Sequence, residues 1–429
     1  MNPGQLLIIA LSLPAWIAIL LYLFRYPEIA LALFIFAYVV EGGQRLLYVP
    51  LSAIMLVIAA IGFLFPVALG RKSYFKLNAS DLSLWLFVII LFIGSYSVTD
   101  PQYGLVKAGR FFTAVFAPYM LTRIFMKRYD QLKRFLVGIL GIAFGVAIAL
   151  IALRLLQRNS GRMYFFEANP IPLAVLFSVG LIVAIVGTLE HLWENSRLGK
   201  AYSVIIIPVL LYSLLLTASR GPLIALIVGL ASYFVFCGRS IWRMILRLAL
   251  TTTVLVTVGV LSPVIWNFLF QRAPIPNIDY YNPEFILRGL PTLERLEKYL
   301  TAIAFFKQNP LFGIGTSGFG LLTEFGYPHN IFLEIAAENG LLGLIVFGYF
   351  LMVVTHHGFR YVVFYLPRLN KQLRSIGLTV IVITVSLLIE KQFSFALDMN
   401  KDLFTFLGLV INLPTMALGD KCSRNVGGK

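Results

Sequence analysis

The sequence is poor in charged residues and in cysteine. Only 13% of its 429 residues are Asp, Glu, Lys or Arg, and it has two cysteines. Soluble domains carry about 25% charged residues, so this composition excludes a soluble globular protein. Two cysteines are too few for a disulfide framework or for a metal site built from cysteines.

The chain contains instead repeated apolar runs of about 15 to 24 residues, separated by short charged stretches. About 20 apolar residues in a helix cross the hydrocarbon core of a membrane. A membrane β-barrel is excluded, because its strands would alternate apolar and polar residues. We therefore predict an all-α, polytopic helical integral membrane protein with about 12–13 transmembrane helices. The predicted spans are 5–24, 27–40, 46–69, 82–98, 104–122, 135–156, 170–188, 201–217, 221–237, 244–266, 336–355, 375–393 and 403–418.

The number of spans depends on the first 40 residues. Thirteen spans place the N-terminus on the outer side of the membrane. If residues 1–40 form one re-entrant unit, the chain has twelve spans and its N-terminus is cytoplasmic. No small-residue cleavage site follows the first apolar run, which is followed directly by Arg25. We therefore expect a retained helix and not a signal peptide.

The net charge of +16 is distributed unevenly between the two sides that the spans define. The segments on one side hold 21 Lys and Arg against 6 Asp and Glu, and those on the other side hold 14 against 13. Lys and Arg concentrate in cytoplasmic loops of membrane proteins, so the basic side is predicted to be cytoplasmic. This explains the positive charge better than nucleic-acid binding does.

One loop, 267–330, is much longer than the others and is predicted to lie outside the cytoplasm. Long ordered loops are usually functional. Within it, apolar residues at three-to-four spacing predict a helix over 292–308, with Thr292 as N-cap, ended by Asn309-Pro310. The predicted organisation is N-terminal transmembrane helices in 1–266, a periplasmic catalytic loop in 267–335, and C-terminal transmembrane helices with a cytoplasmic tail in 336–429.

A glycine-rich stretch follows that helix, from Gly313 to Gly320. Its glycines permit tight turns and close backbone approach. It is not a nucleotide-binding phosphate loop, because no Lys-Ser or Lys-Thr pair follows it.

Of the four histidines, only His329 is predicted to lie at the outer membrane boundary. It precedes a helix that carries Glu334 and Glu338, and carboxylates at such a boundary are costly without a purpose. One outer histidine cannot make a zinc site, which needs three or four protein ligands. Asp398 and Asp402 are expected to belong to a solvated turn and not to a cation site. We predict no metal and no cofactor.

Arg220 stands in the turn Ser219-Arg220-Gly221 between two apolar runs. A forked guanidinium matches phosphate oxygens, although an arginine near a helix end also serves to reach the membrane surface. Ionisable groups within the spans are few, which argues against an ion-coupled transporter. The cations predicted for the outer face suggest a site for an anionic, lipid-attached substrate; they are Arg220, Arg272, Arg288, Arg295 and Lys298.

Three motifs resemble those of the bacterial O-antigen ligase and polymerase superfamily. The first is Ser219-Arg220-Gly221, and the second is Arg295 followed by Asn309-Pro310-Leu-Phe-Gly313-Ile-Gly315. The third is similar to the ligase signature of His-Asn, nine residues, and Gly-x-x-Gly, here His329-Asn330 and then Gly340-Leu-Leu-Gly343. The resemblance covers about 200–355.

The resemblance implies an inverting, metal-independent enzyme at the periplasmic face of the inner membrane. Such enzymes move a glycan from undecaprenyl diphosphate to a sugar hydroxyl, which a neutral histidine can deprotonate while arginines offset charge on the leaving diphosphate. We expect His329, Arg220 and Arg295 to be catalytic. We expect substrate binding from Arg288, Arg272, Lys298, Asn330 and Glu334.

The acceptor and two alternative functions remain open at this point. The histidine signature favours ligation onto lipid A–core over polymerisation of lipid-linked repeat units. A flippase for polyprenyl-linked glycans would need a cationic cavity through the membrane. A different polyprenyl-phosphate glycosyltransferase would use an acidic base in an early outer loop, with Glu41 the better candidate and Asp100 the weaker one. Nucleic acid is not an expected partner, whereas membrane lipids are.

Overall fold

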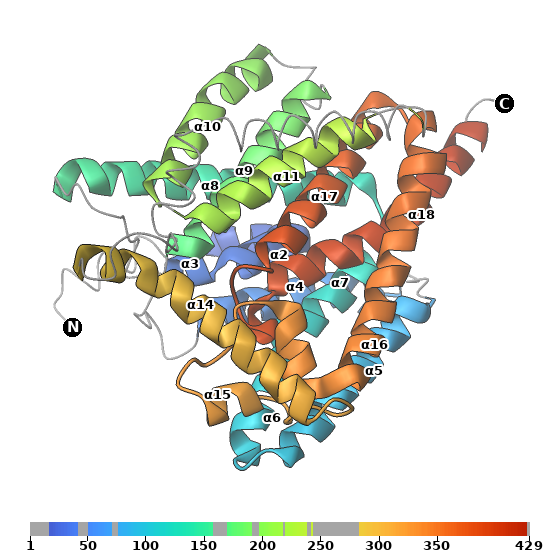
Figure 1. The fold of residues 1–429 in the computed structure, drawn as a ribbon. Coiled ribbons are helices and arrows are strands. Elements are labelled where there is room, and N and C mark those ends of the chain that lie inside the picture. Colours follow the sequence, from blue (N-terminus) through green and yellow to red (C-terminus); the bar gives the residue numbers. More distant parts are fainter. Residues whose placement is uncertain are drawn as a thin grey trace, which may run out of the picture. The chain divides into compact units, whose positions relative to one another are not determined.

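The computed structural model describes residues 17–41, 50–70, 76–157, 170–190, 197–217, 219–237, 242 and 283–426, without the side chains of 40–41, 197–204, 283–293 and 419–426. Every regular element in these residues is a helix, and no strand occurs among them. Figure 1 shows the helices in chain order. The predicted all-α class is confirmed. The predicted span 244–266 lies outside the described residues.

Seven helical segments of the described residues are long and apolar enough to cross a membrane. This confirms a polytopic membrane protein. Two shorter apolar helices, Ile205–Leu216 and Arg220–Phe236, coincide with two further predicted spans. The predicted span 104–122 is helical but is not among the seven. The seven segments are Leu51–Ala68, Ala79–Ser97, Tyr129–Leu155, Pro170–Leu189, Ile331–Arg368, Lys371–Glu390 and Lys401–Leu418.

The first two apolar runs form a bent pair, Ile17–Arg25 and α2 (Pro27–Phe36), with an angle of 106° between them. Pro27 occupies the first turn of α2, and the residue before a proline is disfavoured in the helical region. Tyr26 accordingly has φ −127° and ψ 69°. The pair counts as one broken span or a re-entrant loop, so the described residues hold up to eight spans.

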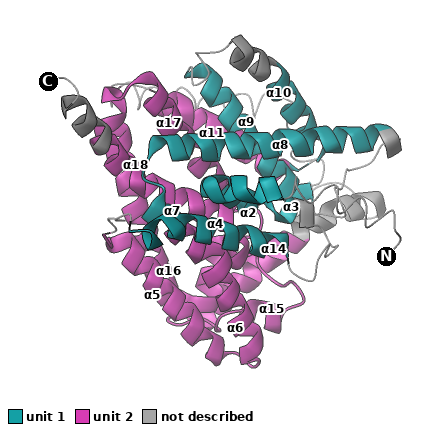
Figure 2. Ribbon diagram, turned by 180° about the vertical axis from the view of Figure 1, so that it is seen from behind, with its two compact units in different colours: residues 1–75, 121–219 teal, residues 76–120, 220–429 magenta. Residues whose placement is uncertain are grey.

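The chain forms two compact units, shown in different colours in Figure 2. Unit 1 comprises 1–75 and 121–219, and unit 2 comprises 76–120 and 220–429. Each unit therefore combines two separate stretches of the chain. The predicted division into transmembrane and loop segments at residues 266 and 335 describes how the chain crosses the membrane, and it stays a prediction.

Unit 1 is built on helix pairs that pack closely. The rings of Phe63 and Phe125 stack on each other, with their centroids 5.3 Å apart. An Arg134 guanidinium contacts the buried Glu28 carboxylate. Its helices are α2, α3 (Tyr38–Glu41), α4 (Leu51–Ala68), α8 (Tyr129–Gln157), α9 (Pro170–Leu189) and α10 (Arg197–Leu216), and α7 (Ala117–Phe125) crosses the boundary between the units.

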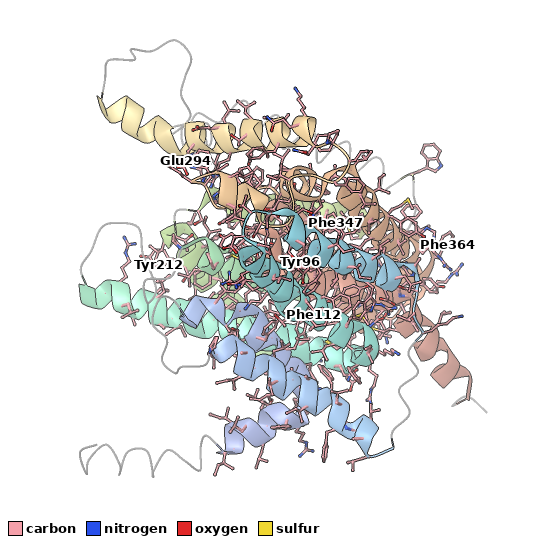
Figure 3. All side chains as sticks on the ribbon, turned by 90° about the horizontal axis from the view of Figure 1, so that it is seen from below. Tyr96, Phe112, Tyr212, Glu294, Phe347 and Phe364 are labelled. Carbon is pink, nitrogen blue, oxygen red and sulfur yellow. The ribbon has the colours of Figure 1, made fainter. Side chains whose placement is uncertain are left out.

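Unit 2 holds an aromatic core that joins its longest helices. Phe347, labelled in Figure 3, lies 5.5 Å from Phe87 and 6.1 Å from Phe404 between ring centroids. Phe350 stacks on Phe404 at 5.9 Å. Such pairs contribute roughly 0.5–1.5 kcal/mol each beyond area burial. The core therefore fixes α5 (Ala79–Gly94), α16 (Ile331–Arg360) and α18 (Lys401–Val426) together.

Unit 2 contains further helices besides these three. They are η1 (Ser95–Ser97), α6 (Pro101–Arg110), η2 (Phe111–Phe116), α11 (Arg220–Phe236), α14 (Pro283–Gln308), α15 (Gly318–Leu322), η3 (Tyr361–Tyr365), η4 (Leu366–Arg368), α17 (Lys371–Glu390) and η5 (Leu397–Met399). A small second apolar cluster, Ala302 with Phe319 and Ala337, joins α14, α15 and α16.

The helix predicted at 292–308 is confirmed in its body and in its end at Gln308, but its predicted start was wrong. Helix α14 begins at Pro283, so Thr292 lies inside it and is not an N-cap. Proline is favoured at the first helical position, where its missing N–H is not needed. Leu296, Leu300 and Ile303, which carry the apolar spacing, are exposed, whereas Ala302 is buried. The spacing therefore predicted a helix but not the face of it that packs.

Candidate active site

The loop between α17 and α18, residues 391–400, contacts two of the elements that the sequence singled out. The backbone carbonyl of Gln392 accepts long hydrogen bonds from the Tyr299 hydroxyl of α14, at 3.4 Å, and from the Asn330 side chain, at 3.5 Å. Tyr299 lies one turn after Arg295, and residues four apart share a helix face. Asn330 follows His329. Arg295 and His329 therefore come from elements that meet on one loop.

The start of α11 packs against the same loop. A Cβ added to Gly221 would lie 3.4 Å from the Cβ of Phe393. Arg220 is the first residue of α11 and is half-buried. Positive charge is unfavourable beside a helix N-terminus. Helix stability therefore does not explain an arginine at this position, which fits a role in binding an anion.

The two predicted cations on α14 have different environments. Arg295 is exposed and makes no ion pair with a described residue. The Lys298 ammonium is buried, 2.6 Å from an oxygen of Glu294, and lies over the Phe325 ring at 5.3 Å from its centroid. Glu294 is labelled on α14 in Figure 3. Arg295 is thus open to a ligand, whereas Lys298 is held by its own helix.

His329 is held in an unusual local structure. Its φ is 59°, a left-handed conformation that few residues other than glycine adopt. The Tyr327 ring lies against the imidazole, with centroids 4.4 Å apart. Nδ1 is buried without a hydrogen-bond partner among the described residues. Nε2 is not among the buried unpaired atoms of the described residues.

The surroundings of His329 favour its neutral form. Burial, reinforced by the positive charges of Lys298 and Arg295, lowers the pKa of the imidazole to about 4, and only Glu294 opposes them. The sequence left the direction of this shift open. The imidazole consequently keeps a free electron pair throughout the physiological pH range.

Asn330, and not His329, caps the helix that follows. The Asn330 side-chain oxygen accepts the N–H groups of Phe332 and Leu333, at 3.0 and 3.1 Å. This is the normal N-cap arrangement. The imidazole is therefore not needed to cap α16, although Asn330 was predicted as a substrate-binding residue and that role stays a prediction.

Helix α16 is interrupted at Gly340, which has φ 62° and ψ −156°. The break leaves backbone groups of both helix halves without intrahelical partners. The loop after α14 supplies them. The bonds run from Ile314 N–H to Ala337, from Gly315 N–H to Glu338, from Leu341 N–H to Pro310 and from Leu342 N–H to Leu311, at 2.8–3.1 Å.

Close backbone contact explains the glycines of both motifs. A Cβ on Gly313 would lie 2.4 Å from the carbonyl carbon of Glu338, and one on Gly340 would lie 2.5 Å from the carbonyl oxygen of Leu311. Both glycines also have positive φ. The glycine-rich stretch thus joins the segment after α14 to the broken helix that follows His329.

A buried ion cluster lies on the first turns of α16. The Lys107 ammonium of α6 is 2.6 Å from an oxygen of Glu334 and 2.7 Å from an oxygen of Glu338. Both carboxylates are fully buried. Glu334 was predicted to bind substrate; it is instead enclosed by protein groups here, and a contact with substrate stays a prediction.

The other predicted residues lie in varied places. Asp402 pairs with the buried Lys391 at 2.9 Å, and Asp398 lies 4.0 Å from Arg110. Asp100 caps α6 through the N–H of Gln102. The side chains of Arg288 and Glu41 and the whole of Arg272 lie outside the described residues. No group of three His, Cys, Asp or Glu in the described ranges is arranged to hold a metal ion.

Sequence reasoning missed Lys107, Tyr327 and Gln392. A lysine inside a predicted span is a usable signal, because such a charge needs a buried partner. Nothing in the local sequence marks Tyr327 or the Gln392 carbonyl. The buried charges of unit 2 also show that ionisable groups near the spans are more numerous than the sequence suggested.

Comparison with known proteins agrees with the motifs. Residues 203–348 match the family described as O-antigen ligase. This range contains Arg220, Arg295 and His329. No curated protein matches the chain.

Proposed function

We propose that this chain, whose residues 203–348 match the family described as O-antigen ligase, transfers a glycan from undecaprenyl diphosphate to a sugar hydroxyl at the periplasmic face of the bacterial inner membrane. The acceptor we favour is lipid A–core. The family match supports a glycan-transfer role of the ligase or polymerase type. Donor, acceptor and compartment are the parts that we infer.

The reaction needs one group that accepts a proton and groups that offset the negative charge on the leaving diphosphate. The acceptor hydroxyl oxygen attacks the anomeric carbon, the bond from that carbon to the diphosphate oxygen breaks, and His329 Nε2 takes the hydroxyl proton. The departing undecaprenyl diphosphate carries the electron pair. Arg295 and Arg220 offset the negative charge that develops on it. Attack from the face opposite the diphosphate inverts the anomeric configuration.

The observation that carries the proposal is the state of His329. A neutral imidazole stands beside the exposed Arg295, at the start of a helix whose cap is supplied by another residue. A histidine that does not cap its helix, with a free electron pair and a neighbouring cation, suits proton abstraction next to an anion. Its position in the family match supports glycan transfer in particular.

The charge distribution supports the compartment. The outer segments are nearly neutral, and the segments on the opposite side carry most of the +16. By the positive-inside rule, loop 267–330 then faces the periplasm. Undecaprenyl-linked glycans presented in the outer leaflet would reach His329 from the membrane side.

The test is transfer by the purified protein in lipid vesicles, given an undecaprenyl-diphosphate oligosaccharide with or without lipid A–core. A single shifted core band that requires core supports the ligase. A ladder of longer lipid-linked glycans without core assigns the polymerase. Movement of intact donor across the vesicle membrane, with no new glycosidic bond, would contradict the proposal and favour a flippase.

A further inference from the structure

The ion cluster beneath His329 draws on four separate segments of unit 2. Lys107 comes from α6, and Glu334 and Glu338 lie one turn apart on α16. The second oxygen of Glu334 accepts the N–H of Leu397, from the loop before α18, at 2.9 Å. An oxygen of Glu338 accepts the N–H of Ser317, from the glycine-rich loop, at 2.9 Å. Figures 1 and 2 show α6, α15 and the start of α16 at one end of the unit.

The charge of Lys107 is what allows this arrangement. Two carboxylates four residues apart on a helix repel each other, and buried charges without partners are strongly unfavourable. The Lys107 side chain is 10% exposed, and its ammonium reaches both carboxylates. Removing it would leave two buried negative charges side by side.

The cluster is coupled to His329 through the first turn of α16. The backbone N–H of Glu334 donates to the carbonyl of Asn330 at 2.9 Å, and Asn330 directly follows His329. The left-handed backbone of His329 persists only where surrounding structure fixes it. A displacement of Glu334 would therefore move the imidazole relative to Arg295 on α14.

We propose that Lys107 is a positioning residue for His329, acting by holding Glu334 and Glu338 on the first turns of α16. Its ammonium is paired with both carboxylates. This inference rests on the proposed role of His329 in glycan transfer. A misplacement of about 1 Å in a catalytic group lowers turnover by roughly 100-fold.

The main test is Lys107→Met, which keeps the length of the side chain and removes its charge, assayed for kcat and for donor binding in the reconstituted protein. We expect kcat to fall about 10- to 100-fold, with binding of the undecaprenyl-linked donor changed by less than about threefold. Lys107→Arg, which retains the charge, should recover part of kcat. The matched control is Arg134→Met, which breaks the buried contact with Glu28 in unit 1. It should leave kcat per folded molecule unchanged.

A second measurement is independent of activity. Thermal unfolding of Lys107→Met, Glu338→Gln and the double variant should show coupling, with the double variant more stable than Lys107→Met alone, because one uncompensated carboxylate is removed. If the wild-type protein transfers no glycan, the proposed function fails. The unfolding temperatures of these three variants still test whether Lys107 stabilises the two carboxylates. Wild-type kcat in folded Lys107→Met, a loss of donor binding equal to the loss of kcat, or additive unfolding temperatures would overturn the proposal.

Discussion

At the residue scale, the state of His329 determines what the site can do. An imidazole with a pKa of about 4 is always neutral near pH 7, but it is a weak base. Lys298 and Arg295 contribute to that low pKa. A bound diphosphate would offset both charges, so donor binding should raise the pKa of the imidazole and strengthen it as a base when it is needed.

This gives a prediction for pH dependence. A protonated His329 cannot accept the hydroxyl proton, so activity falls as the pH drops below its pKa. The kcat/KM profile reports the free enzyme and should fall only near pH 4, whereas the kcat profile reports the bound enzyme and should fall at higher pH. Steady-state transfer measured from about pH 4 to 8 tests this. An acid limb of kcat/KM near pH 6.5, the reference value for histidine, would contradict the described surroundings.

The arginines give a second prediction. Arg295→Ala and Arg220→Ala should each lower kcat by about 100- to 1,000-fold, the usual effect of removing one group that stabilises developing negative charge. Lysine should restore little at either position, because a point charge cannot reproduce a forked pair of donors. Lys307→Ala removes an exposed cation from the same helix as Arg295 and should leave transfer unaffected. Wild-type turnover in Arg220→Ala would remove that residue from the site.

At the scale of elements, the interrupted helix α16 is the feature that organises the site. Its break lets the loop after α14 bond to both halves, which joins the elements of Arg295 and His329. Gly340, the first glycine of the Gly-x-x-Gly part of the ligase-like signature, is thus required for the structure and not for catalysis.

Substitution of this glycine should be destabilising. Gly340→Ala would place a Cβ 2.5 Å from the Leu311 carbonyl oxygen and hold alanine at φ 62°, which costs about 1–3 kcal/mol for the backbone alone. Gly348→Ala is the control, since nothing lies within 4 Å of its Cβ. It should be neutral or stabilising by about 0.5–1 kcal/mol. Thermal unfolding in detergent distinguishes them, and equal stability of both variants would show that the break is not required.

Sequence reasoning recovered what local patterns encode and missed what long-range packing decides. Apolar runs predicted the helical membrane fold, and short motifs singled out His329, Arg220 and Arg295, whose catalytic roles stay predictions. The break at Gly340 was not predicted, because a single glycine inside an otherwise helical pattern is tolerated and does not by itself mark an interruption. Lys107 could not be paired with Glu338 from sequence, since 231 residues separate them. The early start of α14 was missed because Gly289 and Pro291 lower the helix propensity of the segment before Thr292.

At the scale of the whole molecule, the account requires the outer loop to face the periplasm. After replacement of Cys237 and Cys422, a cysteine at the exposed Glu324 should react with an impermeant thiol reagent in intact spheroplasts. A cysteine at Lys371, at the start of α17, should react only after the membrane is opened. The reverse pattern would place His329 in the cytoplasm and contradict the proposed route of the donor.

In the proposed reaction, His329 removes the proton of the acceptor hydroxyl during glycan transfer. The most direct measurement is single-turnover transfer by His329→Gln with donor binding followed in parallel. Glutamine keeps a hydrogen-bonding side chain but cannot take the proton, so transfer should fall about 100- to 10,000-fold while donor binding is retained. Near-native transfer by this variant would contradict the account and leave His329 as a residue that only orients its loop.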